Sequence, residues 1–408
     1  MTGQDVLRPL LLRPLATPAM HLLAGYLRDL HSGRLHLEFS GHATQTLGSA
    51  GAPEATLVVH NPSALLRRVV LRGAIGFAES YIAAEWETPD LAALLRLLVR
   101  NRGQLRAPLA FNPARWTNRL RHRLRCNNRS GSRRNIRAHY DLGNDFYSLW
   151  LDSSMSYSAA LFSDPQSASF DDLAAAQQCK YQRMLDLIAA RPGDRILEIG
   201  CGWGGFALAA ARRGLKVTGI TLSHEQLAYA RARVLQAGVQ HLVELRLQDY
   251  RDLDQSFDHV VSIEMMEAVG EAYWETYFAT LKRCVRPGGR IALQVITIDE
   301  ARFDSYRSTP DFIQMHIFPG GMLPTQTALQ RLGEQAGMVW LDCARFGQHY
   351  ARTCELWNAR CHRQASAIRG LGFDEQFLRR WHYYLSYCQA GFETGAIDLV
   401  QVALQRPG

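Results

Sequence analysis

The residues with the clearest chemical meaning form a glycine-rich segment near the middle of the chain. Residues 195–200 have the apolar character of a buried strand and lead through Gly200, Gly202 and Gly204 into a small-residue helix predicted for residues 206–213. Glycine lets the backbone approach a bound group closely, and a turn between a strand and a helix is a frequent place for such a group. The segment therefore predicts a ligand site.

An acidic residue distinguishes between two classes of ligand for this site. A dinucleotide site needs the spacing G-x-G-x-x-G to cradle a pyrophosphate, but the spacing from Gly200 is G-x-G-x-G-G. Glu198, two residues before the first glycine, would repel a pyrophosphate and attract the cationic amino-acid end of a ligand. The segment favours S-adenosylmethionine (SAM) over NAD, and a turn without any ligand is the plain structural alternative.

The elements that must position this loop follow from the regular alternation of strands and helices after residue 191. Ser223 is a predicted helix N-cap, with Gln226 in capping-box position. Apolar runs predict strands at residues 195–200, 215–221, 243–247, 257–263 and 290–297. This order predicts an α/β fold with a doubly wound, Rossmann-like sheet, with ligands at the carboxyl ends of its strands.

The chain before this region has a different organisation. Short predicted strands at 33–39 and 55–60 and helical spacing in 75–84 and 91–99 predict a smaller mixed N-terminal domain. We expect three parts: an N-terminal domain that docks on lipid, an arginine-rich linker and a catalytic domain. Their predicted bounds are 1–112, 113–136 and 137–408.

Arginines are concentrated around the predicted linker. Thirteen of them lie between Leu91 and Tyr140, a segment without one Asp or Glu. The formal net charge of +8 of the whole chain is therefore concentrated in this segment. Such a segment suits an anionic membrane surface, where each nearby Arg or Lys contributes about 1 kcal/mol. The same charges would also suit nucleic acid, and a solvated linker without a partner is the third interpretation.

Composition limits the remaining classes of protein. With 408 residues, 47% hydrophobic and 21% charged, the chain is expected to be globular with two domains. It has no run of about 18 to 20 apolar residues and no signal sequence, so we expect a cytoplasmic protein peripherally associated with the inner membrane. Eight cysteines without C-x-x-C pairs or clusters at metal-ligand spacing predict reduced thiols and no metal site.

Seven blocks of residues stand in order along the chain, at residues 139–147, 155–158, 197–205, 219–223, 247–253, 318–324 and 383–392. Through these blocks, residues from about 137 to 404 resemble the catalytic region of the cyclopropane-fatty-acyl-phospholipid synthase family, which implies a fold of the class I SAM methyltransferase type. The N-terminal domain also has the length expected of the bacterial members that act on phospholipids.

This resemblance implies a role for each residue of the cofactor site. Tyr157 and Ser158 would approach the methionine end of SAM, beside the glycine loop. Thr221 and Gln226 would contact the ribose, and Asp249 would bond the adenine amine. The structural alternatives are that Thr221 only ends a strand and that Gln226 only caps a helix.

The resemblance also implies the reaction. A methyl group would pass from SAM to the cis double bond of an unsaturated acyl chain in a membrane phospholipid, creating a carbocation that an aromatic face can stabilise. Tyr140 is the candidate for that face, with ordinary packing as the alternative. Loss of a proton from the new methyl group closes a cyclopropane, the product we expect. Loss from a neighbouring chain carbon gives a methyl-branched alkene, as in relatives that make furan fatty acid precursors.

The expected base is where this sequence departs from the family. There, a bicarbonate ion usually takes the proton, and Glu267, Ile296 and Tyr350 match three of its ligands. Ala159 stands in place of a cysteine, and Gln294 in place of a histidine. Gln294 can still hydrogen bond to an anion but cannot become cationic. We expect bicarbonate to bind more weakly, or Glu267 to act on its own.

Two other classes of function are the alternatives. A nucleic-acid methyltransferase typically carries an Asn/Asp-Pro-Pro-Tyr-like motif after the fourth strand, but residues 264–267 here are Glu-Met-Met-Glu, so no nucleic-acid partner is expected. A lipid-binding protein without catalysis would explain the missing Cys and His. The expected partners are membrane phospholipids, an anionic membrane surface and a second copy of the chain in a homodimer.

Overall fold

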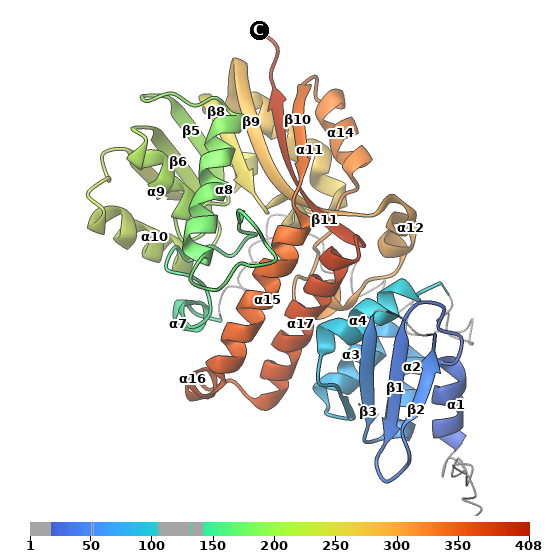
Figure 1. Ribbon diagram of the computed structural model, residues 1–408. Coiled ribbons are helices and arrows are strands. Elements are labelled where there is room, and N and C mark those ends of the chain that lie inside the picture. The colour runs from blue at the N-terminus through green and yellow to red at the C-terminus, as the bar shows by residue number, and fades with distance from the viewer. Residues whose placement is uncertain (1–17, 50, 52, 104, 106–130, 132–141) are drawn as a thin grey trace, which may run out of the picture. The chain divides into compact units, whose positions relative to one another are not determined.

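The computed structural model describes residues 18–49, 51, 53–103, 105, 131 and 142–408 (Figure 1). The chain divides into two compact units, Met1–Pro113 and Ala114–Gly408. The predicted arginine-rich linker, apart from Gly131, and the predicted aromatic residue Tyr140 lie outside the described residues.

The N-terminal unit is built on a small mixed sheet of order β2-β1-β3-β4. Strands β1 (Arg34–Phe39) and β3 (Glu54–Val59) are parallel, while β2 (Gln45–Gly48) and β4 (Trp86–Glu87) pair antiparallel at the edges. Alternate residues of β1 and β3 are buried, as the sequence pattern predicts. The described helices are α1 (Pro18–Tyr26), α2 (Pro62–Arg72), α3 (Ala74–Ile82) and α4 (Leu91–Arg100). The prediction of a smaller mixed N-terminal domain is confirmed.

The C-terminal unit contains a seven-stranded sheet of order β10-β11-β9-β8-β5-β6-β7. Five strands pair in parallel: β5 (Arg195–Ile199), β6 (Lys216–Thr221), β7 (Val243–Leu247), β8 (Phe257–Ile263) and β9 (Val285–Ile298). Strands β10 (Val339–Arg345) and β11 (Ile397–Gln405) are added antiparallel. The chain runs outward from β5 to β7 and then returns to β8 on the other side of β5. The direction of winding therefore changes between β5 and β8, where such sheets bind ligands.

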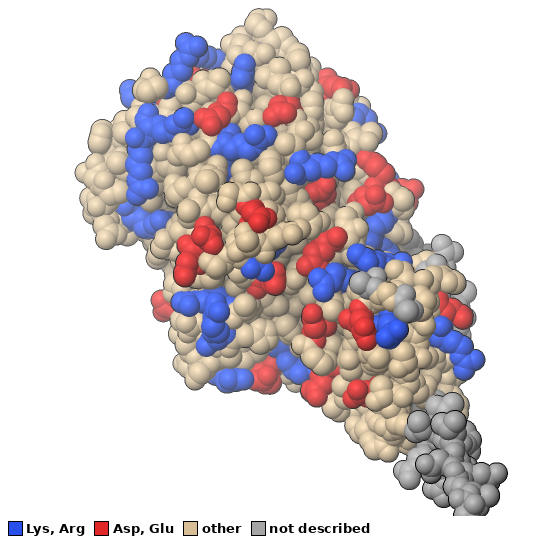
Figure 2. Space-filling view, in the orientation of Figure 1, with Lys and Arg blue, Asp and Glu red and all other residues tan. Residues whose placement is uncertain are grey.

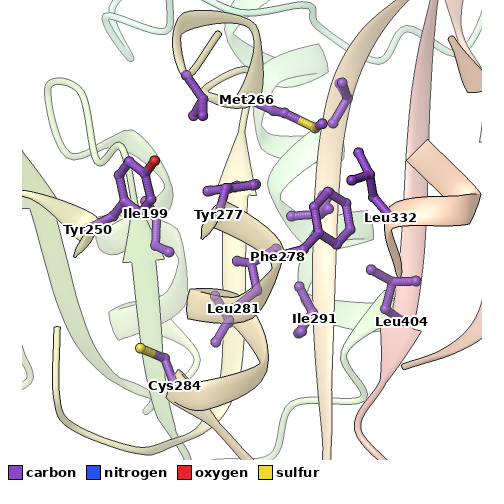
Figure 3. Close-up of a cluster of buried hydrophobic side chains, with 14 of the residues drawn as sticks. Ile199, Tyr250, Met266, Tyr277, Phe278, Leu281, Cys284, Ile291, Leu332 and Leu404 are labelled. Atoms are coloured by element: carbon purple, nitrogen blue, oxygen red, sulfur yellow. The ribbon is translucent and has the colours of Figure 1, made fainter. Parts of the chain in front are cut away.

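Helices on both faces of this sheet divide its apolar residues into two cores. Helices α8 (Leu173–Leu187), α9 (Gly205–Arg212) and α10 (His224–Gln236) cover one face, and α11 (Trp274–Cys284) and α14 (Gln326–Gln335) cover the other (Figure 1). Figure 3 shows part of the second core, where Tyr277, Phe278 and Leu281 of α11 lie against the strands. The predicted doubly wound α/β fold is confirmed, and its buried strands form a firm frame for the loops at their ends.

A helical hairpin packs against β11 and was not predicted from the sequence. Helices α15 (Gly347–Arg363) and α17 (Glu375–Glu393) are joined through the short α16 (Ala365–Gly370) and pack side by side (Figure 1). Tyr350 of α15 stacks on Phe392 of α17, with ring centroids 4.4 Å apart. The hairpin thus fixes the position of Tyr350. The other short helices among the described residues of this unit are α7 (Asn144–Ser148), η1 (Tyr250–Asp252), η2 (Met266–Ala268), η3 (Glu271–Tyr273), α12 (Glu300–Ser308) and α13 (Phe312–His316).

Candidate active site

The glycine-rich loop lies at the carboxyl end of β5. Gly200, Gly202 and Gly204 have φ angles of +87°, +49° and +84°, a left-handed backbone that favours glycine. A Cβ on Gly204 would lie 3.2 Å from the Cβ of Ala230, whereas a Cβ on Gly202 would meet nothing within 4 Å. Gly204 therefore allows α9 to pack closely on α10, while Gly202 borders open space that a ligand can use.

The buried carboxyl group of Glu198 in β5 is suited to bind a cationic group of a ligand. The residue is only 3% exposed, and its Oε2 has no hydrogen-bond partner among the described residues. Burial raises the pKa of its carboxyl to about 8, against the attraction of Lys180. A buried carboxylate oxygen without a partner is unfavourable, and the amino group of a bound SAM would supply both charge and hydrogen bond. The residues of this loop therefore fit SAM.

The two residues expected at the ribose are in contact with each other. Thr221 ends β6, and its hydroxyl donates to Oε1 of Gln226 at 3.0 Å. Ser223 caps α10 by accepting from the Gln226 backbone amide at 3.2 Å. The Gln226 side chain therefore contacts Thr221 and does not complete a capping box with Ser223. Both side chains are buried, Thr221 at the end of β6 and Gln226 in the first turn of α10, and their contact with a ribose stays a prediction.

Asp249, the residue expected at the adenine, follows β7 and is 2% exposed. Its carboxylate forms a bidentate ion pair with Arg251, with Oδ1–Nε and Oδ2–Nη2 distances of 2.8 and 2.6 Å. This pair holds the carboxylate in one orientation. An adenine amine could bond only to a lone pair that Arg251 leaves free.

The segment that carries Tyr157 and Ser158 is held by a buried lysine that was not predicted as a site residue. Lys180 of α8 is fully buried and donates to the Ser158 hydroxyl at 2.6 Å. Burial lowers its pKa to about 8, while Glu264, Asp152 and Glu198 act in the opposite direction, in that order. Lys180 is thus a cation within electrostatic reach of both the glycine loop and the end of β8. Tyr157 lies among aromatic rings, and its hydroxyl is 2.8 Å from that of Tyr384.

A second carboxylate, that of Glu264, lies directly after β8 and is held by three donors. Its Oε1 accepts from the Ala159 backbone amide at 2.9 Å and from Nε2 of Gln294 at 2.7 Å. Its Oε2 accepts from the Tyr350 hydroxyl at 2.6 Å. Three residues that the sequence assigned to a bicarbonate site therefore do converge on one anion. That anion is the Glu264 side chain.

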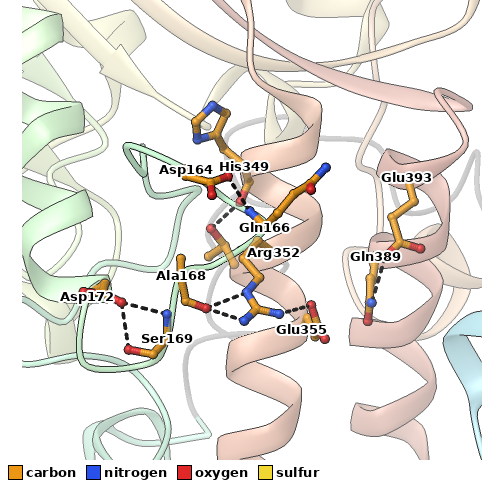
Figure 4. A network of polar contacts seen from close by, with 11 residues as sticks. Asp164, Gln166, Ala168, Ser169, Asp172, His349, Arg352, Glu355, Gln389 and Glu393 are labelled. Atoms are coloured by element: carbon orange, nitrogen blue, oxygen red, sulfur yellow. Dashed lines mark hydrogen bonds and ion pairs between the residues drawn. The ribbon is translucent and has the colours of Figure 1, made fainter.

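Neighbouring elements fix the donors in place. Gln401 of β11 donates to Oε1 of Gln294 at 2.7 Å, so the amide nitrogen of Gln294 is directed at Glu264. The loop after Ala159 is fastened to α15, where Arg352 Nε donates to the Ala168 carbonyl at 2.9 Å and Nη1 pairs with Glu355 at 2.6 Å (Figure 4). These contacts hold the loop against the helix that carries Tyr350.

Glu267, the predicted site glutamate, has a different environment. Its Oε1 accepts from the Ile296 backbone amide at 2.5 Å, which brings those two predicted residues together. Its Oε2 is inaccessible to solvent and has no partner among the described residues. Burial, and then the charge of Glu264, raise the pKa of Glu267 to about 8. Of Glu264 and Glu267, Glu267 is therefore the residue that is protonated more readily.

These contacts do not fit a bicarbonate ion bound as the family resemblance implies. The Ala159 amide, the Gln294 amide and the Tyr350 hydroxyl are all engaged by the Glu264 carboxylate. A further anion would lack these donors and would lie beside the charged Glu264 carboxylate. The expectation of weakened bicarbonate binding thus has a physical cause that the sequence analysis did not identify.

A sequence model of the family described as mycolic acid cyclopropane synthetase matches residues 127–402, about two thirds of the chain. The chain belongs to this family of fatty acid methyltransferases. A tuberculostearic acid methyltransferase of Mycobacterium tuberculosis is 43% identical to it over 366 residues, covering 88% of this chain and 86% of the relative. The cyclopropane-fatty-acyl-phospholipid synthase of Escherichia coli K12 is 34% identical over 359 residues, covering 87% and 89%.

The three-dimensional structure is also similar to that of a solved member of the family. A mycolic acid cyclopropane synthase solved with SAH and CTAB superposes with a TM-score of 0.62 at 29% identity, covering 67% of this chain and 98% of that chain. Because this family member holds SAH, SAM is confirmed as the cofactor of the family. The α/β methyltransferase fold predicted for the catalytic region is confirmed as well, and the enzyme is SAM-dependent.

Sequence reasoning missed two functional candidates, Glu264 and Lys180. Glu264 entered only as the first residue of the Glu-Met-Met-Glu segment that lacks a nucleic-acid methyltransferase motif. The signal that points to it is an extra acidic residue at the end of a buried strand, in a chain that lacks the expected Cys and His. Lys180 gave no such signal, because a lysine on an amphipathic helix is ordinarily exposed.

Proposed function

We propose that this enzyme transfers the methyl group of SAM to a cis double bond in an acyl chain of a membrane phospholipid. The observation that carries the proposal is the pair of carboxylates at the carboxyl ends of β5 and β8, the adjacent strands where the winding changes direction. Glu198 suits the cationic end of SAM, and Glu264 is an anion in reach of the same buried lysine. Methylation of an alkene needs both a cofactor site and a proton acceptor.

The chain's own residues bind and orient SAM and the acyl chain, and they exclude water. Glu198 and the glycine loop hold the methionine end, Thr221 and Gln226 hold the ribose, and Asp249 holds the adenine. When bound, SAM supplies an electrophilic methyl group. A cis alkene is a weak nucleophile, so alignment in a dry site supplies much of the acceleration.

Aromatic rings surround the segment that faces the methionine end. Tyr157 lies 5.5 Å, between ring centroids, from each of Tyr147, Trp150 and Trp357. Such a lining excludes water, and aromatic faces stabilise a carbocation without reacting with it. We extend the proposed cation-stabilising role of Tyr140 to Tyr157, which belongs to the described residues.

Two products are compatible with this reaction. The sequence favours the cyclopropane, and the likeness to the Escherichia coli synthase supports it. A methyl-branched chain is the second candidate, and the 43% identity to a relative named as a methyltransferase, the tuberculostearic acid methyltransferase, supports that. Which carbon loses its proton decides between them.

The test is lipid analysis after expression in a bacterium that makes unsaturated phospholipids but no cyclopropanes. With methyl-labelled methionine, we expect labelled acyl chains heavier by one CH2 in the phospholipid fraction. Catalytic hydrogenation then separates the products, since a branched alkene takes up hydrogen under mild conditions and a cyclopropane does not. Absence of label from the acyl chains would contradict the proposed function.

We further propose that the arginine-rich segment 113–136 and the N-terminal domain bring the enzyme to the inner membrane from the cytoplasm, as a homodimer. None of the described helices combines the length and the apolar character required to cross a bilayer. On the face drawn in Figure 2, basic and acidic side chains of the described residues are interspersed. The proposal rests on the sequence of the arginine-rich segment 113–136, which lies outside the described residues apart from Gly131. Cosedimentation with vesicles should rise with anionic lipid and fall with salt; equal binding to neutral vesicles would contradict it.

A further inference from the structure

We infer that the Glu264 side chain replaces the bicarbonate ion implied by the family resemblance, and that its Oε2 accepts the proton released by the methylated acyl chain. This inference rests on the proposed methyl transfer and names the base for it. It also transfers the role predicted for Glu267 to a residue three positions earlier.

The hydrogen bonds leave one acceptor position on this carboxylate. Each carboxylate oxygen has two lone pairs. Oε1 uses both of them, for the Ala159 amide and the Gln294 amide, whereas Oε2 receives only the Tyr350 hydroxyl. Burial holds the pKa of Tyr350 well above its ordinary value, so this hydroxyl remains a donor. Oε2 therefore has one lone pair free for a substrate proton, while the other three bonds fix its direction.

The backbone at Glu264 is strained in a way that a purely structural carboxylate would not need. Its φ is +51°, in the left-handed region that residues other than Gly, Asn and Asp rarely adopt. The conformation is retained because the Glu264 amide donates to the Gln294 carbonyl at 2.8 Å and the side chain makes three further bonds. Strain of this kind concentrates at functional sites, where the surrounding contacts maintain it.

The charges nearby assign opposite protonation states to the two glutamates. Burial raises the pKa of Glu264, but the Tyr350 hydroxyl, the Ala159 amide and Lys180 favour its ionised form. Glu267 has one donor and an isolated second oxygen, and the charge of Glu264 further raises its pKa. Two coupled acids in one site divide in this way, one ionised and one neutral. Glu264 is the ionised member and hence the base.

The step balances without another reactant. The alkene π electrons form the bond to the methyl carbon as its bond to sulfur breaks, which leaves SAH and a carbocation on the acyl chain. To close the ring, a C–H bond of the transferred methyl group breaks and its electrons bond to the cationic carbon. To form an alkene, a C–H bond on a chain carbon beside the cation breaks and its electrons form a new double bond. The proton goes to Oε2 of Glu264, and solvent removes it after the product leaves.

The experiment compares wild type, Glu264→Gln and Glu264→Gly on vesicles of unsaturated phospholipid, in CO2-free buffer and with added bicarbonate. Wild-type turnover should be the same in both buffers. Glu264→Gln keeps the size of the side chain but lacks the base, so turnover should fall about 100-fold or more. Glu264→Gly also relieves the backbone strain and frees three donors around an open site. Bicarbonate should therefore restore its turnover at least 10-fold and saturably, whereas chloride should not.

A matched control separates strain relief from chemistry. Ala189 has a φ of +51° as well but lies in the exposed turn after α8, so Ala189→Gly should show no response to bicarbonate. SAM binding by calorimetry reports whether each variant is folded. If Glu264→Gly does not fold, wild type and Glu264→Gln still decide the question. Wild-type activity that requires bicarbonate, or a Glu264→Gln enzyme with more than a third of wild-type turnover, would overturn the inference. Failure of wild type to methylate any lipid would instead contradict the proposed function.

Discussion

Replacing Tyr350 with Phe tests how strongly the hairpin controls the proposed base. The substitution removes the hydroxyl that donates to Oε2 of Glu264 at 2.6 Å. The ring itself remains able to stack on Phe392 at 4.4 Å, so packing is largely preserved. The variant therefore isolates one hydrogen bond to a carboxylate.

The expected magnitude follows from that bond. A hydrogen bond to a charged group contributes about 1.5 to 3 kcal/mol, and one pKa unit corresponds to about 1.4 kcal/mol. The Tyr350 hydroxyl lowers the pKa of Glu264, so its removal should raise that pKa by about 1 to 2 units. A base must be ionised to act, so activity is lost as the pH falls through its pKa. The acid limb of the pH profile should move to higher pH by the same amount.

The assay is kcat against pH at saturating SAM and lipid, which reports groups in the bound complex. At a pH above the shifted limb, the variant should regain most of the wild-type rate. Tyr384→Phe is the control, because it loses a hydroxyl that bonds to Tyr157 and not to Glu264. An acid limb that stays in place in Tyr350→Phe, or moves to lower pH, would refute the assignment of Glu264.

Three other residues give equally direct predictions. Glu198→Gln should weaken SAM binding and remove its pH dependence, because the wild-type carboxyl must ionise, with a pKa of about 8, before it can pair with the amino group. In the cofactor-free wild type this raised pKa means that the native state holds a proton which the unfolded state has lost. The free energy of unfolding should therefore fall as the pH rises from about 5 to 8, and Glu198→Gln should flatten that fall in denaturant titrations. Gly202→Val should abolish SAM binding, as measured by calorimetry. The control is Gly238→Val, at a glycine that is also left-handed and faces open space but lies in an exposed turn after α10; this variant should lose stability and keep its SAM affinity. Wild-type SAM affinity in Gly202→Val would mean that the loop is misassigned. Glu267→Gln should keep most of the wild-type turnover, because an amide resembles the protonated carboxyl, and a loss as large as that in Glu264→Gln would show that the two glutamates act together.

The sequence by itself determined the framework of the catalytic unit. The apolar runs at β5 to β8 have the length and composition of buried strands, and the helix start at Ser223 is visible because N-capping is a local interaction. The three glycines of the loop adopt the left-handed backbone that made them recognisable. The resemblance in seven blocks led to the correct family.

Only the tertiary structure decided which of the two glutamates accepts hydrogen bonds from three converging donors. Glu264 and Glu267 are three residues apart, and no local rule distinguishes them. The choice depends on donors from four separate segments: the loop at Ala159, Gln294 of β9, Tyr350 of α15 and Gln401 of β11 behind Gln294. These segments are distant in sequence and meet only because β11 inserts beside β9 and the helical hairpin folds back on the sheet. The positive φ of Glu264 is likewise maintained by these long-range bonds, since the intrinsic preference of glutamate opposes it.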